Sequence, residues 1–306
     1  MSQDCYHRRV RRAACAALAL SAILLVSTEL NAWGESGHRM IGLAAAHSLP
    51  DDMPAFFRRA ARTLSYLNPE PDRWRDRGER DKDAALDGAA SPDHFMDLEL
   101  IPAERLASAL AAPNRWAFID TLHKLRLDPV AVGLLPWRIV EMTPTVRVEF
   151  RLWRAATEPA MRRMIEARII NDAGILGHYV ADGSNPTHMS IHYNGWSGAN
   201  PNGYATDKRL HGRFESDFVD ARLRIQDITP LIDRQASVSA DFRAATIAYL
   251  KQSNALVERL YQLDKAAPFG AGNAVGENKA FTAERLAAAA QMLRDLWYSA
   301  YVTSGG

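Results

Sequence analysis

The sequence predicts an all-α fold, organised as a single-domain bundle of several helices. Long segments repeat apolar residues at helical steps, and no segment alternates apolar and polar residues as a half-buried strand would. Connections rich in Pro, Gly and Asn separate the helical segments at 68–93, 183–207 and 266–279. No linker or internal repeat divides the sequence, so we expect one large domain after the N-terminal segment.

The first 32 residues have the three parts of a secretion signal. A start with four arginines precedes an apolar run at 13–26, which is too short for a stable membrane anchor, and a polar segment then ends at Ala32. We expect cleavage between Ala32 and Trp33 and export to the periplasm or the extracellular space. An uncleaved amphipathic arm is the alternative. No second apolar run of membrane length follows, so we expect no integral membrane segment after processing.

Removal of residues 1–32 would change the composition in two ways. Both cysteines, Cys5 and Cys15, would be lost, which leaves no disulfide and no thiolate metal ligand. Four Arg, one Asp and one Glu would also be lost, so Lys plus Arg falls from 37 to 33 and Asp plus Glu from 36 to 34. The formal charge moves from +1 to −1. Such a balance argues against a protein that coats duplex nucleic acid by general electrostatic attraction.

Four segments of the mature chain carry helical patterns. Residues 37–66 predict one or two helices, and residues 236–263 predict one long helix. The segment 148–180 places Leu152, Ala156, Met161, Met164, Ala167 and Leu176 mostly at helical steps. Pro159 predicts either a break there or a first-turn position. Thr282 is a start signal for a last helix that continues to Ala300. The role of residues 100–146 stays open.

Histidines and carboxylates recur at spacings that suit metal binding. His178 and Asp182, and then His211 and Glu215, are each four residues apart, so each pair lies on one face of a helix. His188 follows the helix break at Asn185-Pro186, and a further histidine stands upstream in SPDHFMD. One such pair is more often a surface pair, but two pairs flanking another histidine favour a metal site. Imidazole and carboxylate ligands without thiolate suit hydrolytic zinc with open positions for water.

The ordered motifs W-G-x-x-G-H, H-F-x-D, H-x-x-x-D-x-x-x-P-x-H and H-x-x-x-E span most of the mature chain. This set resembles the superfamily of secreted single-strand-specific zinc nucleases and bacterial zinc-dependent phospholipases C. The resemblance implies an all-helical protein with a trinuclear zinc site. It also implies that the mature N-terminal tryptophan is a ligand through its free amine and its carbonyl oxygen. A start at Trp33 would explain why this residue follows the signal directly.

Carried over residue by residue, the resemblance implies three zinc ions per chain. The ligands fall in three sets, with one carboxylate bridging the first two: Trp33, His38 and Asp182; Asp72, His94, His178 and Asp182; and His188, His211 and Glu215. The first aspartate of the second set is the least certain, because Asp76, Asp81, Asp83 and Asp87 are rivals. We favour Asp72 because an arginine follows three residues later, similar to the Asp-x-x-Arg of the nucleases. A solvated charged loop is the alternative for this segment.

The resemblance also implies the reaction. Two zinc ions that share a carboxylate lower the pKa of a bound water to about 7, which prepares it to attack phosphorus in line. Asp72 would orient this water and Arg75 would add charge in the transition state. In nucleases the residues corresponding to Phe95 and Asp97 contact a base, by stacking and by a hydrogen bond. A core aromatic and a structural carboxylate are an equally good interpretation of these two residues.

The substrate class stays open between two members of the superfamily. The spacing from Trp33 to His38 and the Asp72-x-x-Arg75 pair are similar to the nucleases, whereas Glu215 as last ligand is similar to the phospholipases. We slightly favour a monomeric nuclease on single-stranded nucleic acid, with 3′-nucleotidase-like activity, over a phospholipase C acting on phospholipid head groups. An exported zinc-binding protein without turnover is a further alternative. The loop at 193–209 differs from both groups, and its Trp and Tyr either line a cleft or belong to a simple connection.

Overall fold

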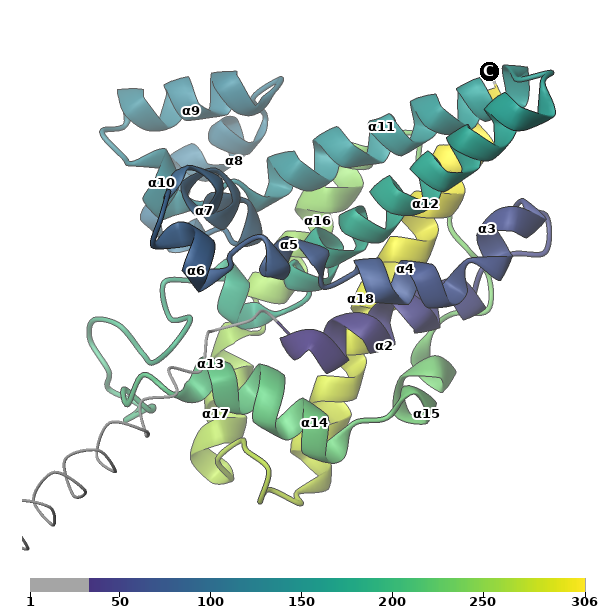
Figure 1. Cartoon of the computed structure of the whole chain (residues 1–306). Coiled ribbons are helices and arrows are strands. Elements are labelled where there is room, and N and C mark those ends of the chain that lie inside the picture. The colour runs from purple at the N-terminus through teal and green to yellow at the C-terminus, as the bar shows by residue number, and fades with distance from the viewer. Residues whose placement is uncertain (1–32, 306) are drawn as a thin grey trace, which may run out of the picture. The chain divides into compact units, whose positions relative to one another are not determined.

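A computed structural model describes residues 33–305 (Figure 1). The expected secretion signal, residues 1–32, therefore lies outside the described residues. Within 33–305 the chain forms helices and turns and no strand, apart from one isolated bridge in the loop that follows residue 190. This confirms the all-α prediction. No helix in this part of the chain has the length and apolar character needed to cross a membrane.

Five helices form the centre of the bundle (Figure 1): α2 (Gly34–His47), α4 (Ala61–Leu67), α11 (Leu135–Ala155), α12 (Pro159–Asp182) and α18 (Gly276–Val302). The long helices α11, α12 and α18 pack side by side, and α2 and α4 pack against α12. Their shared interior holds large apolar side chains such as Phe57, Phe150 and Trp297. Burial of this apolar surface is the main favourable contribution to the fold.

The remaining helices are short or peripheral. They are α3 (Ala55–Arg59), α5 (Glu70–Arg73), α6 (Arg77–Arg80), α7 (Ala85–Ala90), α8 (Ala103–Leu110), α9 (Arg115–Lys124), α10 (Pro129–Val132), α13 (Leu210–Gly212), α14 (Val219–Arg222), α15 (Ile225–Ile228), α16 (Phe242–Asn254) and α17 (Val257–Ala266). Short 3-10 helices include η1 (Ser91–His94) and η3 (Pro186–Met189), and η4 (Arg213–Phe218) is a π-helix. The segment 100–146, whose role was open, thus supplies α8, α9, α10 and the start of α11.

Two helix boundaries differ from the sequence prediction. The last helix begins at Gly276, and Thr282 lies inside it, where its hydroxyl donates to the carbonyl of Asn278 as a buried mid-helix threonine can. The segment 236–263 contains two helices, because the chain leaves the helix at Ala255 and Asp241 caps only the first of them. Pro159 is the first residue of α12, so the break at this proline is real and the proline stands in the first turn.

Helix α12 changes from exposed to buried along its length. Met161 and Met164 in its first turns are exposed, as is Leu152 in α11. Their apolar spacing correctly indicates a helix but does not mark its buried face. Every residue from Asp172 to Asp182 is buried, including polar ones. Gly174 permits this close packing, because a Cβ there would lie 2.5 Å from the Cβ of Leu67 on α4.

One buried acid group lies in the bundle away from the predicted ligands. Glu149 on α11 is buried beside Asp172 on α12, and Arg168 Nε lies 3.2 Å from Glu149 Oε1. Burial, with the neighbouring Asp172 carboxylate, raises the pKa of Glu149 from 4.5 to about 8. A raised carboxyl pKa means that folding retains a proton that the unfolded chain releases. Stability therefore falls as pH rises from about 4.5 to 8.

Glu149→Gln is expected to remove this component of the pH dependence, because glutamine imitates the protonated acid. At pH 9 the variant should unfold about 2–4 °C above the wild type, which corresponds to roughly 1 kcal/mol for a domain of this size. At pH 5 the two melting temperatures should agree. Thermal unfolding followed by circular dichroism between pH 5 and 9 measures this, with the exposed Glu158→Gln as control. If the melting temperature of Glu149→Gln differed from that of the wild type by the same amount at pH 5 and pH 9, the raised pKa would not belong to Glu149.

Candidate metal centre

Three groups of histidines and carboxylates meet at the buried end of α12. Their potential ligand atoms lie within 4.8 Å of one another in each group, and the groups are His38, His178 and Asp182; Asp72, His94 and His178; and His188, His211 and Glu215. The side chains come from α2, α5, η1, α12, η3 and the segment α13–η4. Elements far apart in the sequence thus bring eight of the nine predicted ligand residues into three adjoining groups.

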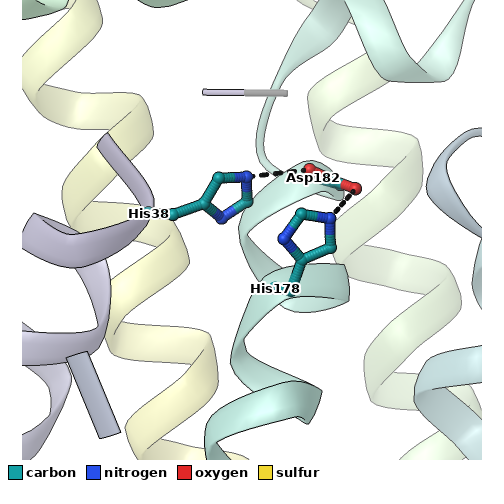
Figure 2. A group of neighbouring side chains, drawn as sticks. All are labelled: His38, His178 and Asp182. Atoms are coloured by element: carbon teal, nitrogen blue, oxygen red, sulfur yellow. Dashed lines mark ion pairs between the residues drawn. The ribbon is translucent and has the colours of Figure 1, made fainter. Parts of the chain in front are cut away.

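Asp182 lies at the centre of this arrangement, and its side chain is fully buried. Its Oδ1 is 3.5 Å from His38 Nε2, and its Oδ2 is 3.3 Å from His178 Nε2 (Figure 2). The same Oδ2 is 3.2 Å from His94 Nδ1. His188 Nδ1 lies 4.0 Å from the same Oδ2. Each carboxylate oxygen therefore faces a different histidine set, which is the geometry that a bridging ligand requires.

Asp72 is the aspartate of its segment that reaches the groups. Its carboxylate lies 3.8 Å from both His94 Nδ1 and His178 Nε2, and 3.9 Å from His38 Nε2. Its rivals lie elsewhere: Asp76 and Asp83 accept from the main-chain nitrogens of Glu79 and Ala85, Asp87 pairs with Arg75 and Arg80, and Asp81 is exposed.

The third group is built on an irregular helix. His211 stands in α13 and Glu215 in the π-helix η4, and His211 Nε2 lies 3.0 Å from Glu215 Oε2. His188 Nε2 lies 3.6 Å from the same oxygen. The four-residue spacing keeps His211 and Glu215 adjacent although the backbone is not a regular α-helix. Single π-turns of this kind are frequent at functional sites.

Three histidines are oriented by carbonyl oxygens behind them. The Nδ1 atoms of His38 and His178 donate to the side-chain and main-chain oxygens of Asn68, at 2.9 and 3.0 Å, and His188 Nδ1 donates to the carbonyl of His94 at 2.7 Å. In each ring Nε2 is then the nitrogen that faces the carboxylates of the groups. A metal-ligating histidine is commonly fixed in this way by a hydrogen bond from its second nitrogen.

The residues fit a set of bound cations. Within 33–305 no hydrogen-bond partner is found for eight buried atoms of the predicted ligand residues: His38 Nε2, both Asp72 oxygens, His94 Nε2, Asp182 Oδ1, His188 Nε2, His211 Nδ1 and Glu215 Oε1. Unpaired buried polar atoms are costly and rare, so their concentration here requires an explanation. Metal ions would satisfy those that face the groups, and nitrogen and oxygen donors without sulfur suit zinc. The structure thus supports three buried groups able to hold metal ions.

The charges of the site favour ionised carboxylates. Burial opposes ionisation of Asp182, but its interactions with the rings of His178, His188 and His38 hold its pKa well below 3.8. Burial likewise opposes ionisation of Glu215, and His211 and His188 lower its pKa overall. Burial lowers the pKa of His178 to about 4, so this ring is neutral at pH 7. Ionised carboxylates and a neutral imidazole are the protonation states that bind a metal.

Trp33 lies at the edge of these groups. Its indole is fully buried, and its Nε1 donates to the carbonyl of Ala181 and to Ser184 Oγ at 2.8 and 3.0 Å. Its main-chain nitrogen donates to Glu215 Oε2 at 3.2 Å. Gly34 follows with a φ of +47°, where a Cβ would lie 3.0 Å from Ser216 Oγ. The observed contact of the Trp33 nitrogen is thus with Glu215 of the third group, whereas the resemblance assigns this nitrogen to the first group with His38 and Asp182.

Of the predicted catalytic and substrate residues, Asp72 lies in the second group, and Arg75, Phe95 and Asp97 are partly buried. Arg75 Nε is 3.6 Å from Asp87, so its observed ion pair is with this carboxylate. Phe95 is half-buried, and Gly133 with a φ of +87° allows the main chain to approach it, since a Cβ there would collide with the Phe95 carbonyl. Burial, with the charge of Glu99, raises the pKa of Asp97 to about 7.

Comparisons of the chain with protein-family models, with curated proteins and with solved structures gave no match. The interpretation of the groups therefore depends on their geometry, on the chemistry of the donor atoms and on the motif resemblance.

Two supporting residues were not identified from the sequence. Asn68 orients both His38 and His178, and Asn185 Nδ2 donates to Glu215 Oε2 at 3.3 Å. In the sequence, Asn185 is recognisable only as part of a helix-breaking pair with Pro186. The one sequence signal for Asn68 is the glycine before His178, because a Cβ at Gly177 would lie 2.4 Å from Asn68 Nδ2. This glycine can be interpreted only when the fold is known, because the fold brings residues 68 and 177 together.

Asn68→Ala is expected to weaken zinc binding by about 10- to 100-fold, the usual cost of losing a residue that orients a metal ligand. The helical content should stay unchanged. Asn68→Asp keeps an acceptor for His38 Nδ1 and should lose less affinity. Competition with a calibrated chelator measures the affinity, and the exposed Asn171→Ala is the control. Wild-type zinc affinity in Asn68→Ala would contradict the positioning role.

Proposed function

We propose that the mature chain is an exported zinc-dependent phosphodiester hydrolase of the zinc nuclease and phospholipase C type. The observation that carries this proposal is the trio of buried ligand groups around Asp182, whose facing nitrogen and oxygen atoms include many without a partner in the described part of the chain. A buried set of this kind is costly unless cations bind there. The proposal also rests on the order and spacing of the motifs in the sequence.

Three zinc ions would be held by the ligand sets that the motifs imply, with Asp182 bridging the first two: Trp33, His38 and Asp182; Asp72, His94, His178 and Asp182; and His188, His211 and Glu215. When bound, they would supply Lewis-acid charge to the phosphate and increase the acidity of water. Asp72 would accept a hydrogen bond from the attacking water through a carboxylate oxygen. Arg75 would exchange its partner Asp87 for the phosphate and offset charge in the transition state.

We favour single-stranded nucleic acid as the substrate. Half-buried Phe95 offers a ring to a base, and Asp97, whose pKa is about 7, offers a carboxyl group for a hydrogen bond to it. Glu215 at the third group favours the alternative, a phospholipase C acting on phospholipid head groups. The zinc-loaded mature protein should be assayed side by side on single-stranded RNA and on phosphatidylcholine. Cleavage of RNA alone supports the nuclease, and cleavage of phosphatidylcholine alone supports the phospholipase.

A zinc-binding protein without turnover is the remaining alternative. It predicts full zinc content with no hydrolysis of nucleic acid, phospholipid or bis(p-nitrophenyl) phosphate. That result would contradict the proposed enzyme activity and leave the metal assignment in place.

Asp182→Asn is expected to reduce zinc content from about three ions to about one per chain, because one carboxylate serves two sets and an amide bridges poorly. Hydrolysis should fall by more than about 100-fold, beyond the usual cost of losing a residue that only orients a ligand. His211→Ala should remove mainly the third ion. Metal analysis after gel filtration measures both, with Asp120→Asn on the surface as control. Retention of all zinc by Asp182→Asn would show that the carboxylate does not bridge.

One extra methionine before Trp33 is expected to remove one zinc and most of the hydrolysis while the protein stays helical. In the extended chain the nitrogen of Trp33 is an amide without a basic lone pair. The free α-amine has a reference pKa of about 7.7–8.0 and loses its proton readily to a metal. Removal of the extra residue by an aminopeptidase should restore both properties. Equal zinc content and activity before and after that removal would mean that Trp33 is only a core aromatic.

A further inference from the structure

The segment 191–208, called here the 191–208 loop, is a packed structure. His192 stacks on Trp196 with ring centroids 3.9 Å apart, and Tyr204 packs against the same indole at 4.8 Å. Tyr261 on α17 fixes the loop from behind: its hydroxyl donates to the His192 carbonyl and accepts from Gly195 N. A loop held by its own aromatic side chains presents a defined surface, as compact functional loops do.

The loop is joined directly to the third ligand group. The main-chain nitrogen of His211 donates to Asn194 Oδ1 at 3.2 Å. The ring of Tyr193 meets the ring of His211 nearly at a right angle, with centroids 6.1 Å apart. A ligand that rests on Tyr193 would therefore lie beside the third group.

A cavity of about 200 Å³ opens in this loop. Its lining includes Tyr193, Asn194, Trp196, Ser197, Thr206 and Lys208. Tyr193 is 49% exposed, so part of its ring is open to a ligand. Lys208 is exposed as well, and within 33–305 it makes neither an ion pair nor a side-chain hydrogen bond. The cavity thus combines a free aromatic face with a free cation.

The backbone of the loop is shaped to keep this cavity. Lys208 has a φ of +56°, a conformation that costs energy for a residue with a side chain and is frequent at functional sites. Gly195 has a φ of +132°, and a Cβ there would lie 3.2 Å from the main chain of Thr206. These two positions let the ends of the loop approach each other, and Lys208 is part of the cavity lining.

We infer that this cavity is a subsite for a nucleobase, with Tyr193 stacking on the base and Lys208 binding the phosphate of the same nucleotide. The inference rests on the proposed function and narrows its substrate class to nucleic acid. Stacking on an aromatic ring is tolerant of base identity and suits a single strand. A quaternary ammonium head group would also accept aromatic rings, but it would be repelled by Lys208. An acyl chain does not fit a lining with Asn194, Ser197 and Thr206.

The test measures binding apart from turnover. Isothermal titration of the zinc-loaded mature protein would compare 5′-AMP with ribose 5-phosphate, which has the same phosphate and no base. Tyr193→Ala and Tyr193→Leu should weaken the binding of 5′-AMP by about 5- to 150-fold, which is the range for loss of one stacked base. In both variants the affinity for ribose 5-phosphate should stay within about twofold of the wild-type value, since this ligand has no base to stack. Tyr193→Phe should bind as the wild type does. The exposed Trp116→Ala serves as the matched control.

Lys208→Gln should weaken 5′-AMP and ribose 5-phosphate equally, by a few-fold, and should reduce the salt dependence of both affinities. Exposed Lys251→Gln on α16 is the control. Zinc content of every variant is measured with the affinity, so that loss of the third ion is distinguished from loss of the subsite.

Unchanged 5′-AMP affinity in Tyr193→Ala and Tyr193→Leu would overturn the subsite, and so would no detectable 5′-AMP binding by the wild type. Phosphocholine is titrated as a third ligand. If the Tyr193 variants lost more affinity for phosphocholine than for 5′-AMP, the cavity would bind a lipid head group and not a nucleobase. The failures are separable. Hydrolysis of RNA that is unaffected by Tyr193→Ala, with unchanged 5′-AMP binding, contradicts the subsite alone. Base-dependent binding without hydrolysis of any substrate contradicts the proposed enzyme alone.

Discussion

The burial of the Asp182 carboxylate is the constraint on which the rest of the structure depends. An ionised group enclosed by helices is tolerated only if surrounding charges and hydrogen bonds compensate for lost water. Here the nearest partners are imidazoles from α2, α12, η1 and η3, so elements far apart in the sequence must meet at one carboxylate. Several facing atoms remain unpaired in this part of the chain. If cations satisfy them, metal binding and the closing of the bundle are energetically one process.

The orientation of the site depends on close packing behind it. Asn68 supplies one oxygen from its side chain and one from its main chain, and these fix the rings of His38 and His178. That position is available because Gly174 and Gly177 let the end of α4 lie against α12. The packing behind the site therefore fixes the direction in which the rings of His38 and His178 point. Preorganisation of this kind reduces the reorganisation needed at a metal or catalytic site.

The sequence indicated the helical class, the break at Pro159 and the two four-residue pairs, because each depends on local spacing. Other features depend on contacts between distant segments. Asn68 acquires its role only when α4 meets α12, and the 191–208 loop is held by Tyr261, more than fifty residues further on. The pattern of Leu152, Met161 and Met164 has helical period but faces solvent, since nothing in the described chain covers those turns. Among five neighbouring aspartates, spacing alone could not select Asp72. Its arginine neighbour suggested it, although that arginine lies against Asp87.

Diffraction from crystals of the mature protein at the zinc absorption edge would test the central claim most directly. The account of the site predicts three anomalous peaks. Two should flank the Asp182 carboxylate, one on the side of His38 and one between Asp72, His94 and His178, and the third should lie between His188, His211 and Glu215. A zinc-loaded crystal with no peak at Asp182, or with peaks only at the protein surface, would contradict it.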